Sequence, residues 1–183
     1  MLSTPRKYLA TGATLALLAL GTPALAEGPT LLTITGSVEN ANRGAVDPEF
    51  DKLFSFNDIS FDKAMEVDRE TLLKLPQVTV KTDFPKGGEM VEFTGPTVED
   101  VLKLAGAEGD MVTIQAMDGY AVDIPMDELI EKGGVVALSR DGRDFGIGNF
   151  GPTQIVFPRA ERADLADMPD DWWVWQIYHI SVD

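Results

Sequence analysis

Two arginines beside a glycine-rich segment are the side chains of this sequence best suited to bind an anion. Arg140 and Arg143 stand at the start of the segment 142–151, which contains four glycines. Glycine lets backbone N–H groups approach a phosphate closely, and a guanidinium binds phosphate through two parallel hydrogen bonds. The glycine spacing matches neither a Walker loop nor a dinucleotide-binding fingerprint. From these residues alone, a β-turn flanked by solvated arginines is favoured over a phosphate site.

The sequence contains one histidine, His179, and no cysteine. The absence of cysteine excludes disulfides, thiolate catalysis and cysteine-bound zinc, iron–sulfur or c-type haem centres. A serine-type triad would need His179, but there is no Gly-x-Ser-x-Gly motif. A histidine metal site would need carboxylates for all its other ligands. Because Ile177 and Ile180 flank it, we expect a structural strand histidine, hydrogen-bonded at the sheet surface, and no metal ligand.

Two groups of acidic residues are candidates for other chemistry. The segment 164–171 holds four aspartates, and hard cations such as calcium bind several carboxylates. Its spacing is not that of an EF-hand and Pro169 interrupts it, so a solvated acidic loop is favoured. Asp118 and Asp123 can be considered as an acid–base pair. Asp118, however, is explained by an Asp-Gly turn, and the turn interpretation is preferred.

A strip of aromatic residues lies close to the C-terminus. Trp172, Trp173, Trp175 and Tyr178 can stack on a flat heterocycle or a carbohydrate. Alternation along a strand would place Trp173 and Trp175 on one face and Trp172 on the other. Core packing is the default interpretation of such a strip.

The first 26 residues have the composition of a secretory signal. A short basic start, Arg6-Lys7, precedes an apolar run over 13–20, and Ala24-Leu25-Ala26 fits a signal peptidase site. The apolar run is shorter than the roughly 20 residues that a membrane-spanning helix needs. We expect cleavage rather than a retained membrane anchor. The expected product is one periplasmic or secreted domain of 157 residues, 27–183.

The chain is strongly acidic. Its formal net charge is −15, and cleavage after residue 26 would leave 13 basic and 30 acidic residues, a net charge of −17. Such a surface repels nucleic acid and anionic membranes and favours cationic partners. Nucleic-acid binding is therefore not expected. General solubility of an exported protein explains the acidity better than a specific cationic ligand does.

Short strand patterns alternate with turn signals along the expected domain. They lie at 32–36, 78–82, 90–93, 111–117, 120–125, 135–139, 153–157 and 172–182, with a weaker one at 54–61. Helices are predicted after Asp68, over 97–105, where Thr97 is an N-cap, and near 126–131. Hairpins outnumber long crossovers. The predicted class is α+β, with a mixed, mainly antiparallel sheet and two or three short helices.

The ordered set of motifs resembles the molybdopterin-binding oxidoreductase domain of the sulfite oxidase family, particularly its short exported bacterial members. The motifs are LTITGSV (32–38), LLKLPQV (72–78), VKTDF (80–84), FTGPTVEDVL (93–102), DGYAVDIP (118–125), GPTQIVFP (151–158) and WWVWQI (172–177). The resemblance spans nearly all of 31–182. Its specificity lies in the order of the motifs, each of which is weak alone.

This resemblance implies a fold that holds a pterin dithiolene cofactor and, in active members, molybdenum chemistry. Catalytic members ligate molybdenum through a cysteine, and the segment 82–84 lies near the position expected for it, without a thiol. The implied pterin site lies between the 140–151 loop and the strand ending at Thr82. Its candidate residues are Thr82, Arg140, Arg143 and Gly151. In this acidic chain a pterin phosphate would need Arg140, Arg143 or Lys81 to counter the surrounding charge.

Three functions follow as hypotheses. The leading one is an exported protein with the molybdopterin-binding fold that acts in the periplasm as a non-catalytic binding or accessory module. The second is an oxidoreductase that holds a molybdenum–pterin cofactor without a protein thiolate. The third is a sensory or scaffold domain that binds a periplasmic protein partner through the aromatic strip or the acidic face. The sequence leaves open whether the chain is an enzyme.

Overall fold

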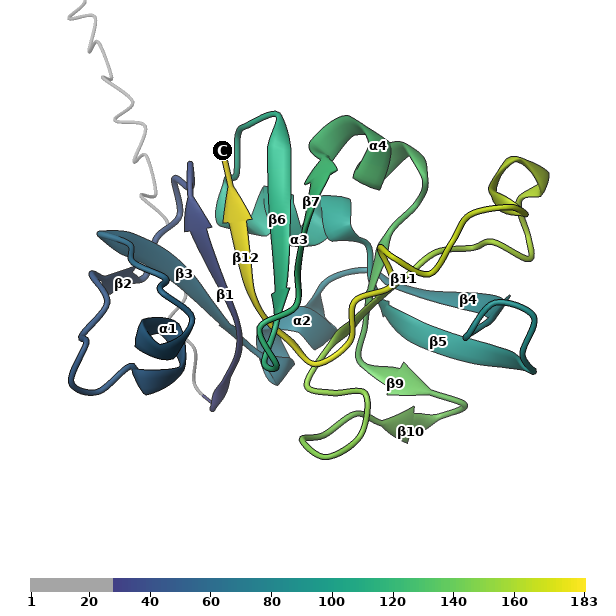
Figure 1. The fold of residues 1–183 in the computed structure, drawn as a ribbon, viewed down its shortest axis with the longest axis horizontal. Coiled ribbons are helices and arrows are strands. Elements are labelled where there is room, and N and C mark those ends of the chain that lie inside the picture. The colour runs from purple at the N-terminus through teal and green to yellow at the C-terminus, as the bar shows by residue number, and fades with distance from the viewer. Residues whose placement is uncertain (1–27) are drawn as a thin grey trace, which may run out of the picture.

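The computed structural model describes residues 28–183. The predicted signal peptide, 1–26, lies outside the described residues. Within 28–183, no helix combines the length and the apolar character needed to cross a membrane. Figure 1 shows one large sheet in one half of the molecule and smaller sheets in the other half.

The large sheet has six strands. Their order is β2 (Arg43–Gly44), β3 (Lys63–Asp68), β1 (Thr30–Gly36), β12 (Ile177–Val182), β6 (Met111–Ala116) and β7 (Ala121–Pro125). β1 and β12 pair in parallel, with Ile34 opposite Ile180, and the other pairs are antiparallel. Both isoleucines are fully buried. The first and last strands of the described chain therefore form the middle of this sheet.

The second half is built on two smaller sheets. The four-stranded sheet has the order β10 (Arg143–Asp144), β9 (Ser139–Arg140), β5 (Met90–Pro96) and β4 (Gln77–Asp83). β11 (Gln154–Val156) pairs with β8 (Val135–Ala137) in a two-stranded sheet. Gly95 permits the close packing of β5 on β8, because a Cβ there would lie 2.0 Å from the carbonyl oxygen of Val136.

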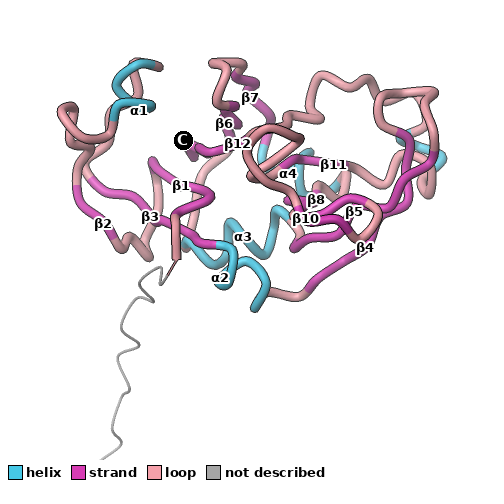
Figure 2. The backbone as a smooth tube through the Cα atoms, turned by 90° about the horizontal axis from the view of Figure 1, so that it is seen from below, coloured by secondary structure: helices cyan, strands magenta, loops and turns pink. Residues whose placement is uncertain are grey.

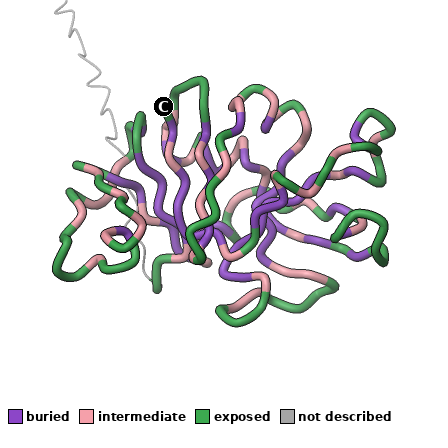
Figure 3. Tube along the Cα trace, viewed as in Figure 1, coloured by how far each residue is buried: buried purple, intermediate pink, exposed green. Residues whose placement is uncertain are grey.

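The described residues include four α-helices. They are α1 (Lys52–Phe56), α2 (Arg69–Lys74), α3 (Val98–Ala105) and α4 (Met126–Glu131), with a short 3-10 helix at Ala163–Leu165. α2 contacts both β3 and β5, and Figure 2 shows α2 and α3 together on one side of the molecule. The predicted N-caps are confirmed, since Asp68 accepts from the Thr71 N–H and Thr97 from the Asp100 N–H. Figure 3 shows the buried residues gathered along the strands.

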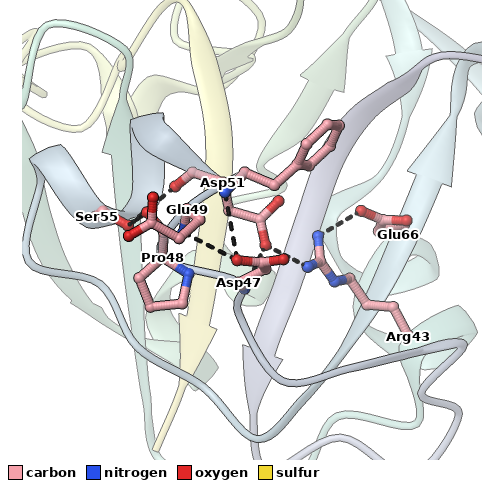
Figure 4. Close-up of polar contacts among 8 residues, drawn as sticks. Arg43, Asp47, Pro48, Glu49, Asp51, Ser55 and Glu66 are labelled. Carbon is pink, nitrogen blue, oxygen red and sulfur yellow. Dashed lines mark hydrogen bonds and ion pairs between the residues drawn. The ribbon is translucent and has the colours of Figure 1, made fainter.

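The predicted α+β class with mainly antiparallel sheets is confirmed, but the strand pattern at 54–61 is wrong. Its first residues belong to α1, and 57–62 is irregular. Arg43 fixes the start of α1 by pairing with Asp51 at 2.6 Å and with Glu66 of β3 at 2.8 Å (Figure 4). Local hydrophobic periodicity does not reveal ion pairs between residues that are distant in the sequence. The strand predicted at 172–182 also begins later than expected, at Ile177.

Candidate functional site

The two candidate arginines meet across a tight hairpin. Arg140 ends β9 and Arg143 begins β10, and the two residues are register partners. Asp141 and Gly142 form the turn with φ angles of 48° and 71°. Positive φ at both central residues is typical of a type I′ turn, which Asp-Gly sequences favour. The predicted turn is confirmed, and it places both arginine side chains on the same face of the hairpin.

A cavity of about 280 Å³ opens beside this hairpin, and we call it the arginine pocket. It is lined by Arg140, Asp141, Arg143, Asp144, Phe145, Asn149 and Phe150. The Arg140 guanidinium carbon lies 5.1 Å from the ring centroid of Phe150 and 5.6 Å from that of Phe93. Rings at this distance position a guanidinium without occupying its N–H donors.

The two pocket arginines differ from the other arginines of the described chain. Within residues 28–183, Arg43, Arg69, Arg159 and Arg162 all form ion pairs with carboxylates, whereas Arg140 and Arg143 form none. The pocket's own carboxylates are engaged elsewhere. Asp144 pairs with Arg69 at 2.6 Å, and Asp141 accepts from the Glu92 N–H at 2.9 Å. The guanidinium donors of this pocket are therefore available to an anion.

Gly151 lies in the loop behind the arginine pocket and has a structural role. It is buried, and a Cβ there would lie 2.6 Å from the Gly146 nitrogen. Its N–H donates to the Asn149 side-chain oxygen at 3.0 Å, and the Gly146 N–H donates to the same oxygen at 3.1 Å. These donors hold the loop together. Glycine at 151 is thus required for the close approach of two backbone segments rather than for an exposed N–H.

Thr82 lies outside the wall of the arginine pocket. It follows Val80 on the buried face of β4 and has no exposed surface. Its hydroxyl has no hydrogen-bond partner within residues 28–183. Of the four candidates, the structure thus brings Arg140 and Arg143 together, places Gly151 in the loop behind them, and encloses Thr82 in the interior.

A second cavity, of about 350 Å³, lies where the two halves of the molecule meet, and we call it the acidic–aromatic cavity. It is lined by Phe84, Ala116, Asp118, Tyr120, Asp170, Asp171, Trp173, Val174 and Trp175. These residues come from the end of β4, from the β6–β7 hairpin and from the segment before β12. The predicted turn role of Asp118 is confirmed, because its carboxylate accepts from the Tyr120 N–H at 3.0 Å.

Arg159 supports the inner wall of the acidic–aromatic cavity. It is 3% exposed, pairs with Asp83 at 3.0 Å and Asp170 at 2.7 Å, and lies 4.4 Å from the ring centroid of Trp173. Burial opposes ionisation of Asp83, but hydrogen bonds from the Gly87 N–H and Arg159 outweigh it, so its pKa is lowered. Sequence reasoning missed Arg159, because a single arginine after a strand forms no motif.

His179 belongs to the interior of the large sheet. Its Nε2 lies 2.8 Å from the Thr35 hydroxyl, and its Nδ1 has no partner in the described chain. Burial lowers its pKa to about 4. The predicted strand position and hydrogen bond are confirmed, but the residue is buried, at 4% exposure, and does not lie at the sheet surface. Within 28–183 no three His, Cys, Asp or Glu residues form a group that can hold a metal ion.

Comparisons with known proteins bear on the fold. No protein-family model and no curated protein matches the sequence. The sulfane dehydrogenase SoxCD from Paracoccus pantotrophus matches the structure with a TM-score of 0.56 and 16% identity, over 88% of this chain. The chain has the sulfite-oxidase-type molybdopterin-binding fold. It spans 40% of the length of the SoxCD chain, and at this identity the likeness shows the fold alone.

The residues present do not fit the molybdenum centre that this fold implies. There is no cysteine to ligate the metal, and Thr82, near the position expected for one, has its hydroxyl enclosed. The arginine pocket, at about 280 Å³, is close to the lower end of the range of about 300–1,000 Å³ typical of cavities for drug-sized ligands. Within residues 28–183 the arrangement offers two guanidiniums to an anion and no group of three metal-ligating side chains to a metal.

Proposed function

We propose that this protein is an exported, non-catalytic binding or accessory module with the molybdopterin-binding fold. The observation that carries the proposal is Thr82. It lies near the position expected for the metal-ligating cysteine, in a chain without cysteine, and its enclosed hydroxyl lines neither the arginine pocket nor the acidic–aromatic cavity. A metal bound elsewhere would lack the thiolate electronics on which the catalytic members depend.

The ligand of this module is a small oxyanion held by Arg140 and Arg143. Three features support this part of the proposal. The two guanidiniums are the arginines without carboxylate partners in 28–183, they share one cavity, and the carboxylates beside them are paired with other groups. Charge-assisted hydrogen bonds to an oxyanion are the interaction that such a pair provides.

Metal and pterin content of the native protein test the non-catalytic role. The protein is purified from its own periplasm, its molybdenum is measured by mass spectrometry, and oxidised pterin is measured by fluorescence. We expect far less than one molybdenum and one pterin per chain. Stoichiometric amounts of both would overturn the proposal and establish the alternative, an oxidoreductase that holds the cofactor without a thiolate.

Calorimetric titration with phosphate and sulfate tests the anion site. We expect the double variant R140A/R143A to lose binding, because each charge-assisted hydrogen bond contributes about 1.5–3 kcal/mol. The control K52A/K74A removes the same charge from exposed positions outside the pocket and should retain binding. Equal loss in both variants would show that net charge, and not this pocket, governs the interaction.

Export is tested separately from ligand binding. We expect the periplasmic protein to begin at Glu27, which mass spectrometry of the intact chain will show. A full-length chain recovered with the membrane would contradict cleavage. For a periplasmic protein partner, we expect a complex that weakens as salt rises, because the net charge of −17 after cleavage makes the association electrostatic.

A further inference from the structure

The acidic–aromatic cavity has the composition of a binding site for a positively charged organic group. We propose that it binds an organic ammonium group, either on a small molecule or on a lysine-type side chain of a partner. This inference goes beyond the anion site proposed above. It does not depend on Arg140 or Arg143, so either site can fail its test without affecting the other.

Aromatic side chains form much of this cavity. Trp175 is 42% exposed and Tyr120 is 47% exposed, so both rings are open to a ligand in this cavity. The Tyr120 side chain is held in place by its hydroxyl, which donates to the Asp171 carbonyl oxygen at 2.9 Å. A cation within about 6 Å of a tryptophan or tyrosine ring is attracted by the electrons of the ring face.

The deeper ring, Trp173, is already enclosed on its faces. It stacks on Phe84 with centroids 5.6 Å apart and planes at 5°, and the Arg159 guanidinium lies over the ring at 4.4 Å. Trp173 is 1% exposed, and its indole N–H has no acceptor within residues 28–183. Its faces are therefore not open to a ligand, and the exposed rings of Tyr120 and Trp175 are the ones that a cation can contact.

The charges around the cavity favour a cation. Asp118, Asp170 and Asp171 line it, and no lysine or arginine does. Arg159 pairs with Asp170, but the carboxylates of Asp118 and Asp171 form no ion pair in the described chain. Two carboxylates next to exposed rings attract a cation and repel an anion. The arginine pocket has the opposite composition.

An organic cation fits better than a metal ion. The three aspartates do not form a group that can hold a metal, and aromatic faces provide no ligand atoms. An ammonium group with methyl or methylene carbons gains from both the carboxylates and the ring faces. The volume of about 350 Å³ accommodates a group of this size. We infer that the recognised unit is the ammonium group with the carbons attached to it.

Titration with choline, tetramethylammonium and a neutral analogue tests the site. Binding is followed by tryptophan fluorescence and by calorimetry at constant ionic strength. The neutral analogue is 3,3-dimethylbutanol, which has the shape of choline without its charge. We expect saturable binding of both cations and at least about 10-fold weaker binding of the alcohol. Equal affinity for the alcohol, or no saturable binding of either cation, would overturn the proposal.

Two variants locate the binding. W175A should weaken choline binding about 10-fold, and D171N should weaken it about 3- to 10-fold, because they remove a ring face and a carboxylate. D127N is the matched control, since Asp127 is an exposed aspartate of α4 outside the cavity. Choline binding that is unchanged in W175A and D171N would show that the ammonium group binds elsewhere.

Peptides distinguish the two sources of the ammonium group. One peptide carries a trimethyllysine, a second carries the unmodified lysine, and a third carries norleucine at the same position. Tighter binding of the lysine peptides than of choline would identify a protein side chain as the ligand. Tighter binding of choline would identify a small molecule. A norleucine peptide that binds as well as both others would contradict recognition of the charge.

Discussion

The arginine pocket and the acidic–aromatic cavity are linked by ring contacts of Phe150 and differ in charge. Phe150 lines the arginine pocket, where Arg140 lies 5.1 Å from its ring. Its ring also lies 6.0 Å from those of Trp175 and Phe84, which line the acidic–aromatic cavity. One cavity offers unpaired guanidiniums and the other unpaired carboxylates. An acidic protein can thus hold sites for both signs of charge within a short distance.

The difference extends to how arginine is used. Arg159 is buried behind the acidic–aromatic cavity and satisfied by two carboxylates and two carbonyls. Arg140 is partly exposed, rests on rings and has no carboxylate partner in the described chain. A buried, fully paired arginine holds structure together, and a partly exposed, unpaired one is available to a ligand.

The largest effect is expected from replacing the buried arginine. R159M leaves Asp83 and Asp170 without their arginine. Breaking a buried pair costs about 3–5 kcal/mol, and we expect the lower end because both carboxylates are partly exposed and keep a backbone N–H donor. R140M removes the same charge from the arginine pocket and should change the free energy of unfolding much less. Urea denaturation of both variants measures the difference. Equal losses would mean that the two arginines do not have different roles.

The second-largest effect is expected on lowering the pH, and it concerns His179 in the large sheet rather than either cavity. His179 has its pKa lowered to about 4 by burial, against about 6.5 when unfolded. The unfolded chain therefore binds a proton that the folded chain refuses, so stability falls as pH drops from 6.5 towards 4, by at most about 3 kcal/mol. Denaturation measured at several pH values should show this slope.

The variant H179Q is the control for that slope. It should remove the loss between pH 6.5 and 4 while leaving a further loss below pH 4. That remaining loss comes from carboxyls such as Asp83 and Asp51. Their lowered pKa values stabilise the folded state above the ordinary pKa of the carboxyl, and this contribution disappears on protonation. An unchanged slope in H179Q would assign the effect to other groups.

Local sequence patterns predicted the arginine pocket better than the acidic–aromatic cavity. Arg140 and Arg143 are joined by an Asp-Gly turn, and its geometry is set by two residues. The other cavity combines Phe84, the 116–120 hairpin and the 170–175 segment, which meet only through tertiary packing. Alternation of apolar and polar residues predicted most strands correctly. It does not show which strand faces are covered by other elements, so it could not predict the burial of Thr82.

A smaller effect is expected at Thr82, which lines neither cavity. Its hydroxyl is buried without a partner, a state that costs about 1–3 kcal/mol. T82V replaces the hydroxyl by a methyl of similar shape and should raise the free energy of unfolding by about 1 kcal/mol. T82S keeps the hydroxyl, loses a methyl and should lower it. Destabilisation by T82V would show that the hydroxyl has a partner, such as a bound ligand.

The smallest effect is expected at Phe150. F150L removes a ring that supports Arg140 on one side and Trp175 on the other, and such contacts contribute about 0.5–1 kcal/mol at exposed sites. Phosphate binding and choline binding should therefore each weaken about 2- to 5-fold. F145L is the control, because Phe145 lines the arginine pocket alone, and it should leave choline binding unchanged. If F150L weakens only one of the two, Phe150 belongs to that cavity and the two sites act independently.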